Sequence, residues 1–285
     1  MAPAAAHFLK SLTSIEMAGM RLRVGARSHV GRVRQVNEDV YLLRARQGLF
    51  VVCDGIGGGP SGELASRVAG DAIVARLTGA DADVPVGHAH ARGRYLPRTS
   101  MLAEAVRRSN ERVYDRARHD RRHTGMGTTV VSAWIAENVA SIAHVGDSRA
   151  YLWYRNRLVA LTCDHSLASA NANNDESALV RALGREPEVD VDLTEVPVRS
   201  GDYLILCSDG LTRMVPETTV GNVIHELREP QRISDRLVEI ALGNGGVDNI
   251  TVIVIEVMGS WWQRLSTQWR PHAGGIPNAE AHPAD

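Results

Sequence analysis

Apolar residues along the chain repeat with two different periods, and each period predicts one kind of element. Short runs of β-branched and aliphatic residues predict strands at Leu22–Arg27, Val40–Ala45, Leu49–Cys53, Thr128–Ile135, Val139–His144, Ala150–Tyr154, Leu158–Leu161, Tyr203–Cys207 and Ile250–Val257. Apolar positions at helical spacing predict helices at Leu64–Leu77, Leu102–Val113, Glu217–Leu227 and Gln231–Leu242. Strands in groups, with pairs of helices between them, favour an α+β fold with antiparallel sheets over a chain of βαβ units.

The two ends of the chain lack this regular alternation, so we predict one domain over residues 21–258. Residues 1–20 are expected to form an N-terminal arm. It is a short amphipathic helix through Phe8, Leu12 and Ile15, a disordered segment, or extra sequence ahead of a true start at Met20. Residues 259–285 are expected to carry a short tryptophan-rich helix that stops at Pro271, followed by an unstructured tail. The helix either packs on the domain or serves as a docking segment.

Composition narrows the possible functions. The 285 residues are 44% hydrophobic, which is ample for a core, and 32 basic against 33 acidic residues give a net charge of −1. We therefore expect no nucleic-acid partner. Lys10 is the only lysine, which excludes a Walker A loop and Schiff-base chemistry. No apolar run is long enough to span a membrane. The three cysteines are too few for a disulfide framework, which predicts a reducing, cytoplasmic location.

Acidic residues recur at the ends of the predicted strands. Asp54 and Asp209 each follow a buried run and precede a glycine, Asp147 follows Gly146, and Asp248 comes just before a strand. Burying one such carboxylate is costly unless its charge is compensated, so several of them indicate a shared cation. Because the candidate ligands are all oxygen atoms, the expected ion is a hard one, Mg²⁺ or Mn²⁺.

The motifs that carry these acids resemble those of the metal-dependent protein phosphatases (PPM, the type 2C serine/threonine phosphatases), in their compact bacterial form. The matching motifs run in family order over nearly all of Arg23 to Val257. They are Arg34–Asp39, Cys53–Gly58 with Gly62–Ser66, Met126–Thr129, His144–Arg149, Leu161–Ser166, Arg181–Gly184, Cys207–Thr212 and Asp248–Thr251. The resemblance implies a central antiparallel β-sandwich flanked by pairs of helices, in four layers, with two metal ions at one edge.

The resemblance also implies a role for each acid. Asp54 would bridge both ions, the Gly55 carbonyl would bind one of them, and Asp209 and Asp248 would hold the other. Glu38 and Asp39 would order metal-bound water, and Asp147 with Asp209 would hold a third, weaker ion. Arg34 would grip the substrate phosphate through its planar fork. The implied reaction is hydrolysis of phosphoserine and phosphothreonine by a metal-bridging hydroxide, without a phospho-enzyme. Arg34, Asp54 and Asp209 would thus be the catalytic residues.

The chain departs from the family pattern in two places. The family usually has a histidine at the position of Gly59, and that histidine is thought to protonate the leaving group. The flap between Leu167 and Arg181 is shorter than usual and consists of small polar residues. We therefore expect slow turnover or protonation from a metal-bound water, and the substrate choice of the relatives does not carry over to this chain.

Two other interpretations compete with this one. Cys207, Gly210 and Arg213 have the spacing of a cysteine-dependent phosphatase, in which a thiolate attacks the phosphorus. Alternatively, Gly59 and the short flap suggest a pseudophosphatase that binds phosphoproteins without turnover. The complete set of expected ligands favours an active metal-dependent enzyme. We expect its partners to be phosphorylated proteins, a Ser/Thr kinase or that kinase's substrates, and we expect a monomer.

Overall fold

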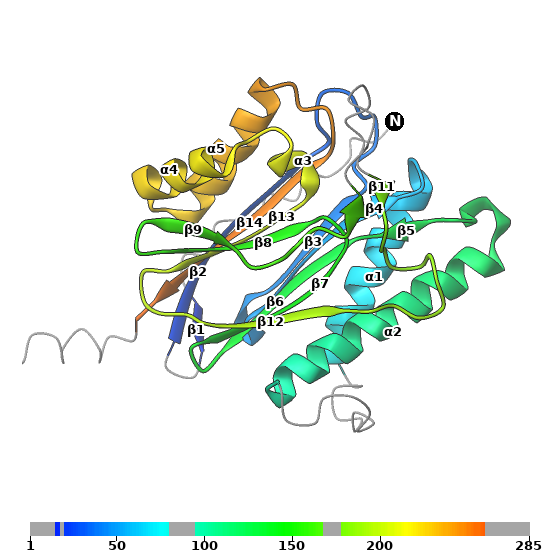
Figure 1. Cartoon of the computed structure of the whole chain (residues 1–285), viewed down its shortest axis with the longest axis horizontal. Coiled ribbons are helices and arrows are strands. Elements are labelled where there is room, and N and C mark those ends of the chain that lie inside the picture. The colour runs from blue at the N-terminus through cyan, green and yellow to red at the C-terminus, as the bar shows by residue number, and fades with distance from the viewer. Residues whose placement is uncertain (1–14, 18–19, 80–94, 168–177, 260–285) are drawn as a thin grey trace, which may run out of the picture.

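The computed structural model describes residues 15–17, 20–79, 95–167 and 178–259 (Figure 1). Its strands are β1 (Ile15–Met17), β2 (Met20–His29), β3 (Asp39–Arg44), β4 (Leu49–Ile56), β5 (Gly127–Thr128), β6 (Val130–Ala136), β7 (Val139–Val145), β8 (Arg149–Tyr154), β9 (Arg157–Ala160), β10 (Ser166–Leu167), β11 (Ala178–Leu179), β12 (Asp192–Pro197), β13 (Tyr203–Cys207) and β14 (Ile250–Met258). Its α-helices are α1 (Pro60–Thr78), α2 (Pro97–His119), α3 (Asp209–Thr212), α4 (Glu217–Leu227) and α5 (Pro230–Gly243).

Two six-stranded sheets form the centre of the fold, and every pairing within them is antiparallel. The first sheet has the order β1-β2-β14-β13-β8-β9, and the second has the order β12-β7-β6-β4-β3, with β5 paired to β4. The last strand, β14, therefore lies between β2 and β13, and it pairs with β2 from Ile250 opposite His29 to Met258 opposite Arg21. This is the predicted α+β fold with antiparallel sheets.

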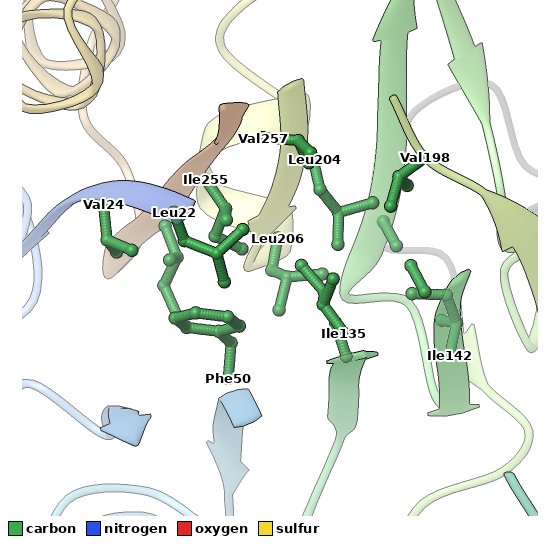
Figure 2. Packing of buried hydrophobic residues seen from close by; sticks show 14 of the residues in the cluster. Leu22, Val24, Phe50, Ile135, Ile142, Val198, Leu204, Leu206, Ile255 and Val257 are labelled. Atoms are coloured by element: carbon green, nitrogen blue, oxygen red, sulfur yellow. The ribbon is translucent and has the colours of Figure 1, made fainter. Parts of the chain in front are cut away.

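Alternate residues of the central strands fill the space between the two sheets. Phe50 of β4 points into this space, toward Leu206 of β13 and Ile255 of β14 (Figure 2), and Val52 and Leu204 belong to the same cluster. All five side chains are at most 1% exposed. Since the core of a sandwich is built from every second residue, the remaining residues of the same strands point to the outer faces.

Helices cover both outer faces, which completes four layers (Figure 1). Val51 and Cys53 of β4 pack under α1 and α2, and Ile205 of β13 packs under α4 and α5. Covering both faces explains why the central strands are continuously apolar. The contact between β2 and α5 is especially close, because a Cβ on Gly25 would lie 2.2 Å from the backbone nitrogen of Gln231.

The helix starts follow simple local rules. α1, α2 and α5 each begin at a proline, whose fixed φ suits the first helical turn and whose missing N–H would have no partner there. At α5 the side chain of Glu229 also accepts hydrogen bonds from the backbone nitrogens of Gln231 and Arg232. The helix α5 therefore begins at Pro230, one residue before its predicted start at Gln231.

Five of the strands and α-helices were missing from the sequence-based prediction, among them the two-residue strands β10 and β11. Ile15–Met17 forms β1, in a stretch expected to be an arm. β12 was missed because it is an edge strand that pairs only with β7, and its alternating Asp192–Pro197 sequence carries little apolar signal. α3 is a single turn, too short to show a helical period. The expected tryptophan-rich helix and most of the shortened flap lie outside the described residues, and the domain boundaries stay a prediction.

None of the helices that the structure describes is both long and apolar enough to cross a membrane.

One buried residue of the sandwich gives a testable consequence for acid stability. His144 on β7 is 1% exposed, and neither ring nitrogen has a hydrogen-bond partner in the described part of the chain. Burial, with a smaller contribution from the charge of His165, lowers the pKa of His144 to about 4. The unfolded chain, whose histidines titrate near their ordinary pKa of about 6.5, therefore binds a proton that the folded chain rejects between these values.

We predict that protonation of His144 in the unfolded chain lowers the free energy of unfolding by about 3 kcal/mol as the pH falls from about 6.5 to 4. The variant His144→Leu should lack this contribution. Urea unfolding followed by tryptophan fluorescence at several pH values measures it. The control is His225→Leu, at an exposed position on α4. An identical pH dependence in wild type and His144→Leu would contradict the prediction.

Candidate metal centre

Strands from both sheets deliver aspartates to one end of the sandwich. In the second sheet, Asp39 opens β3 and pairs directly with Asp54 on β4. In the first sheet, Asp209 follows β13 as the first residue of α3, and Asp248 precedes β14. α3 lies at the same end of the sandwich in Figure 1. Asp147 joins them from the turn between β7 and β8.

The aspartates are close enough to disturb one another's ionisation. Burial raises the pKa of Asp54 well above its ordinary value, and the charges of Asp39, Asp209, Asp147 and Asp248 raise it further. The pKa of Asp39 rises to about 7, first through burial and then through Asp209 and Asp248. Burial followed by the charge of Asp209 raises the pKa of Asp147 to about 6. Such mutual repulsion means that a nearby cation would stabilise the charged form of the group.

Two arginines supply part of this positive charge. Nη2 of Arg34 donates to Oδ2 of Asp248 at 2.8 Å, and Nη2 of Arg213 lies 2.7 Å from Oδ2 of Asp209. The Arg34 side chain is 51% exposed, so its guanidinium faces solvent at the mouth of the site. Five aspartates facing two guanidinium groups leave the site negative and suited to further cations.

The hydroxyl group of Ser208 holds one oxygen of Asp39 in position. Oγ of Ser208 donates to Oδ2 of Asp39 at 2.8 Å, while accepting from the backbone nitrogen of Thr251 at 2.9 Å. Oδ1 of Asp39 and Oδ1 of Asp209 are buried, and neither has a hydrogen-bond partner among the described residues. A buried carboxylate oxygen without a donor is unfavourable unless a cation or a water molecule binds it.

Asn249 fixes the loop that carries Arg34 and Glu38. Its Nδ2 donates to the carbonyls of Val30 and Val36 at 2.9 and 3.0 Å, and its Oδ1 accepts from the backbone nitrogen of Glu38 at 2.8 Å. One side chain thus joins the start of β14 to the loop before β3. Sequence reasoning placed Asn249 in a motif without giving it a role, and its position next to Asp248 was the only available signal.

Glycines let the start of α1 approach Glu38. A Cβ on Gly62 would lie 1.6 Å from Oε2 of Glu38, and one on Gly55 would lie 2.2 Å from the carbonyl oxygen of Gly62. Oε1 of Glu38 accepts from the backbone nitrogen of Gly59 at 2.6 Å. Burial raises the pKa of Glu38, although this hydrogen bond and Arg34 oppose the rise. The glycines of the motif are therefore required by close packing around one carboxylate.

The donor atoms fit a hard divalent cation. Carboxylate oxygens dominate the site, and two of them are buried without a donor. In the described part of the chain, no three His, Cys, Asp or Glu side chains form a ready-made ion site. The structure brings together all the predicted acids, with Arg34 beside them, while their individual roles as ligands stay predictions.

The geometry argues against the cysteine mechanism. Cys207 lies inside β13, fully buried, and its Sγ points to the backbone oxygen of Arg149 at 3.8 Å. Burial raises the pKa of this thiol to about 12, so it is not a thiolate at neutral pH. Arg213 pairs with Asp209 instead of closing a phosphate-binding loop around the sulfur. Sequence reasoning missed this position of Arg213 beside the acids.

Comparisons with known proteins agree with this geometry. A family model described as "Protein phosphatase 2C" matches residues 27–240. The serine/threonine phosphatase stp of Listeria welshimeri is 35% identical over 252 residues, which cover 81% of this chain and 94% of that protein. The serine/threonine protein phosphatase PstP of Mycobacterium tuberculosis is 34% identical over 83% of this chain and 45% of its own length. A crystal structure of the PstP catalytic domain in complex with two manganese ions has a TM-score of 0.69 and 33% identity, and covers 83% of this chain and 98% of that chain.

The close approach of Gly62 to Glu38 yields a prediction. In Gly62→Ala the new methyl group would displace the Glu38 carboxylate, and we expect Mn²⁺ to bind about 10–100-fold more weakly, the usual effect of disturbing groups around a metal site. Isothermal titration calorimetry with MnCl₂ measures this. The matched control is Gly243→Ala at the end of α5, where a Cβ meets nothing within 4 Å. Unchanged affinity in Gly62→Ala would mean that Glu38 has no part in metal binding.

Proposed function

The chain belongs to the protein phosphatase 2C family, and from this premise we propose how its own residues carry out the reaction. It is a metal-dependent protein serine/threonine phosphatase that acts on phosphorylated proteins and uses Mn²⁺ or Mg²⁺. The observation that carries the proposal is the meeting of Asp54 with four other aspartates from both sheets. When bound, two divalent ions lower the pKa of a shared water and neutralise charge on the phosphoryl oxygens.

Each acid has a proposed part in holding these ions. Asp54, which is influenced by the charges of the four other aspartates, would bind both ions, and the Gly55 carbonyl would bind one of them. Asp209 and Asp248, from the other sheet, would hold the second ion. The buried, donor-free Oδ1 of Asp209 supports this assignment. Asp147 is influenced most strongly, after burial, by Asp209, which supports their pairing at a third, weaker position.

Glu38 and Asp39 are proposed to hold water rather than metal. Both have one oxygen already engaged, Glu38 by the backbone nitrogen of Gly59 and Asp39 by Ser208. Oδ1 of Asp39 is left to accept a hydrogen bond from a water molecule in the site. Accepting this bond orients the water's proton away from the phosphate and so directs the oxygen lone pair toward phosphorus.

Arg34 is proposed to bind the substrate phosphate. Asp248 anchors one end of the guanidinium through Nη2, and the rest of the half-exposed fork faces solvent. An anchored planar fork can donate two parallel hydrogen bonds to phosphate oxygens, so it positions the phosphoryl group for in-line attack. The positive charge of Arg34 also stabilises the negative charge on the phosphoryl oxygens in the transition state.

The leaving group is proposed to take its proton from water. Gly59, where the family usually has histidine, has φ 60° and ψ −123°, a conformation that glycine adopts far more readily than other residues. Its backbone nitrogen is bound to Glu38. This loop therefore holds Glu38 rather than presenting an acid to the leaving oxygen, and we propose slow hydrolysis as the consequence.

We further propose that the enzyme opposes a Ser/Thr kinase in the cytoplasm, as a monomer. The kinase follows from the chemistry, because phosphoserine and phosphothreonine in proteins are kinase products. The three cysteines support the reducing location, since Cys53, Cys163 and Cys207 are all free thiols.

The decisive experiment compares ligand and thiol variants. With Mn²⁺ and p-nitrophenyl phosphate, Asp54→Asn and Asp209→Asn are expected to lose at least about a thousandfold in kcat/KM, because each removes metal-mediated charge stabilisation worth several kcal/mol. Cys207→Ser is expected to retain activity, and EDTA is expected to abolish the activity of the wild type. Loss of activity in Cys207→Ser, with retention in Asp209→Asn or in EDTA, would overturn the mechanism.

A further inference from the structure

Arg213 lies beside the proposed metal ligands but has no part in the hydrolysis described above. It caps α3, and its backbone nitrogen donates to the carbonyl of Asp209 at 2.9 Å. This single helical turn places the side chains of residues 209 and 213 on one face. The turn itself therefore directs the guanidinium into the acidic end of the sandwich.

The Arg213 guanidinium lies close to both Asp209 and Asp248, the two acids proposed to hold the second metal ion. Nη2 lies 2.7 Å from Oδ2 of Asp209, and Nη1 lies 3.8 Å from Oδ2 of Asp248. The side chains of Asp209 and Asp248 are only 12% and 16% exposed, and that of Arg213 is 35% exposed. Its charge also interacts with Asp147 and Asp54, so it is shared by four of the five aspartates.

We propose that Arg213 is a built-in counter-ion that competes with divalent cations for Asp209 and Asp248, and thereby raises the metal concentration at which the phosphatase becomes active. This inference rests on the metal roles proposed for these two acids. A cation bound between Asp209 and Asp248 has to share Oδ2 of either acid with a guanidinium, or else displace it. Either outcome makes binding weaker than it would be beside a neutral side chain.

The ion pair also has an effect of opposite sign, because it orients Asp209 and presents its free Oδ1 to the ion. Such orienting contacts are worth about 10–100-fold in metal affinity. Repulsion between a full positive charge and a divalent ion at a few ångströms exceeds this gain in a half-buried site with an effective dielectric constant of about 20. Competition is therefore the larger effect.

The test measures metal affinity and metal-free stability together. In Arg213→Met we expect Mn²⁺ to bind at least about tenfold more tightly in calorimetric titrations, equivalent to about 1.4 kcal/mol. In EDTA we expect the same variant to unfold at a temperature lower by about 2–4 °C, because the acids lose their counter-ion. Arg213→Lys, which keeps the charge, should bind Mn²⁺ much as the wild type does. If Arg213 had only a structural role, its replacement by Met would lower both the Mn²⁺ affinity and the unfolding temperature.

Controls separate this inference from the proposed metal site. Arg236→Met removes an arginine that pairs with Glu239 on the surface of α5, and it should change neither quantity. Asp209→Asn tests the site itself, because wild-type affinity in this variant would remove the metal role of Asp209. Loss of affinity in Asp209→Asn with unchanged or weaker binding in Arg213→Met would overturn the role of Arg213 alone. Arg213→Gln replaces Arg213→Met if circular dichroism shows that the latter does not fold.

Discussion

Repulsion among five neighbouring aspartates is the constraint on which this structure depends. Asp39, Asp54, Asp147, Asp209 and Asp248 come from both sheets, and burial makes the negative charges of the first four costly. The sandwich keeps them together because each is attached to the end of a strand whose apolar residues are packed on two faces. Hydrophobic burial thus stabilises an arrangement that the charges alone would disperse, and the unbalanced charge is what attracts metal.

The arginines show how the same charge can serve different purposes. Arg34 is half exposed and anchored at one end, which suits it to an incoming phosphate. Arg213 is more enclosed and sits between two acids, where its charge is compensated within the protein. With Lys10 as the chain's only lysine, both tasks rely on planar guanidinium groups that can contact two oxygens at once.

The sequence predicted the parts of the fold and site whose signals are local. The long apolar strands were predictable because both faces are covered, and the aspartates because they stand beside glycines at strand ends. β12 was not, since an edge strand needs few apolar residues. Arg213 was misjudged because its contact with Asp209 depends on one turn of helix that has no periodic signal. The bridging role of Asn249 joins segments more than two hundred residues apart, which a single sequence does not reveal.

The position of β14 has a consequence for biosynthesis. The final strand of the domain occupies the interior of the first sheet, between the earliest long strand and β13, and Asp248 stands immediately before it. A nascent chain still lacking this strand has a gap in the middle of its sheet and an incomplete set of acids. Because Asp248 and β14 lie late in the sequence, the acidic end of the sandwich cannot be complete before this part of the chain has been synthesised.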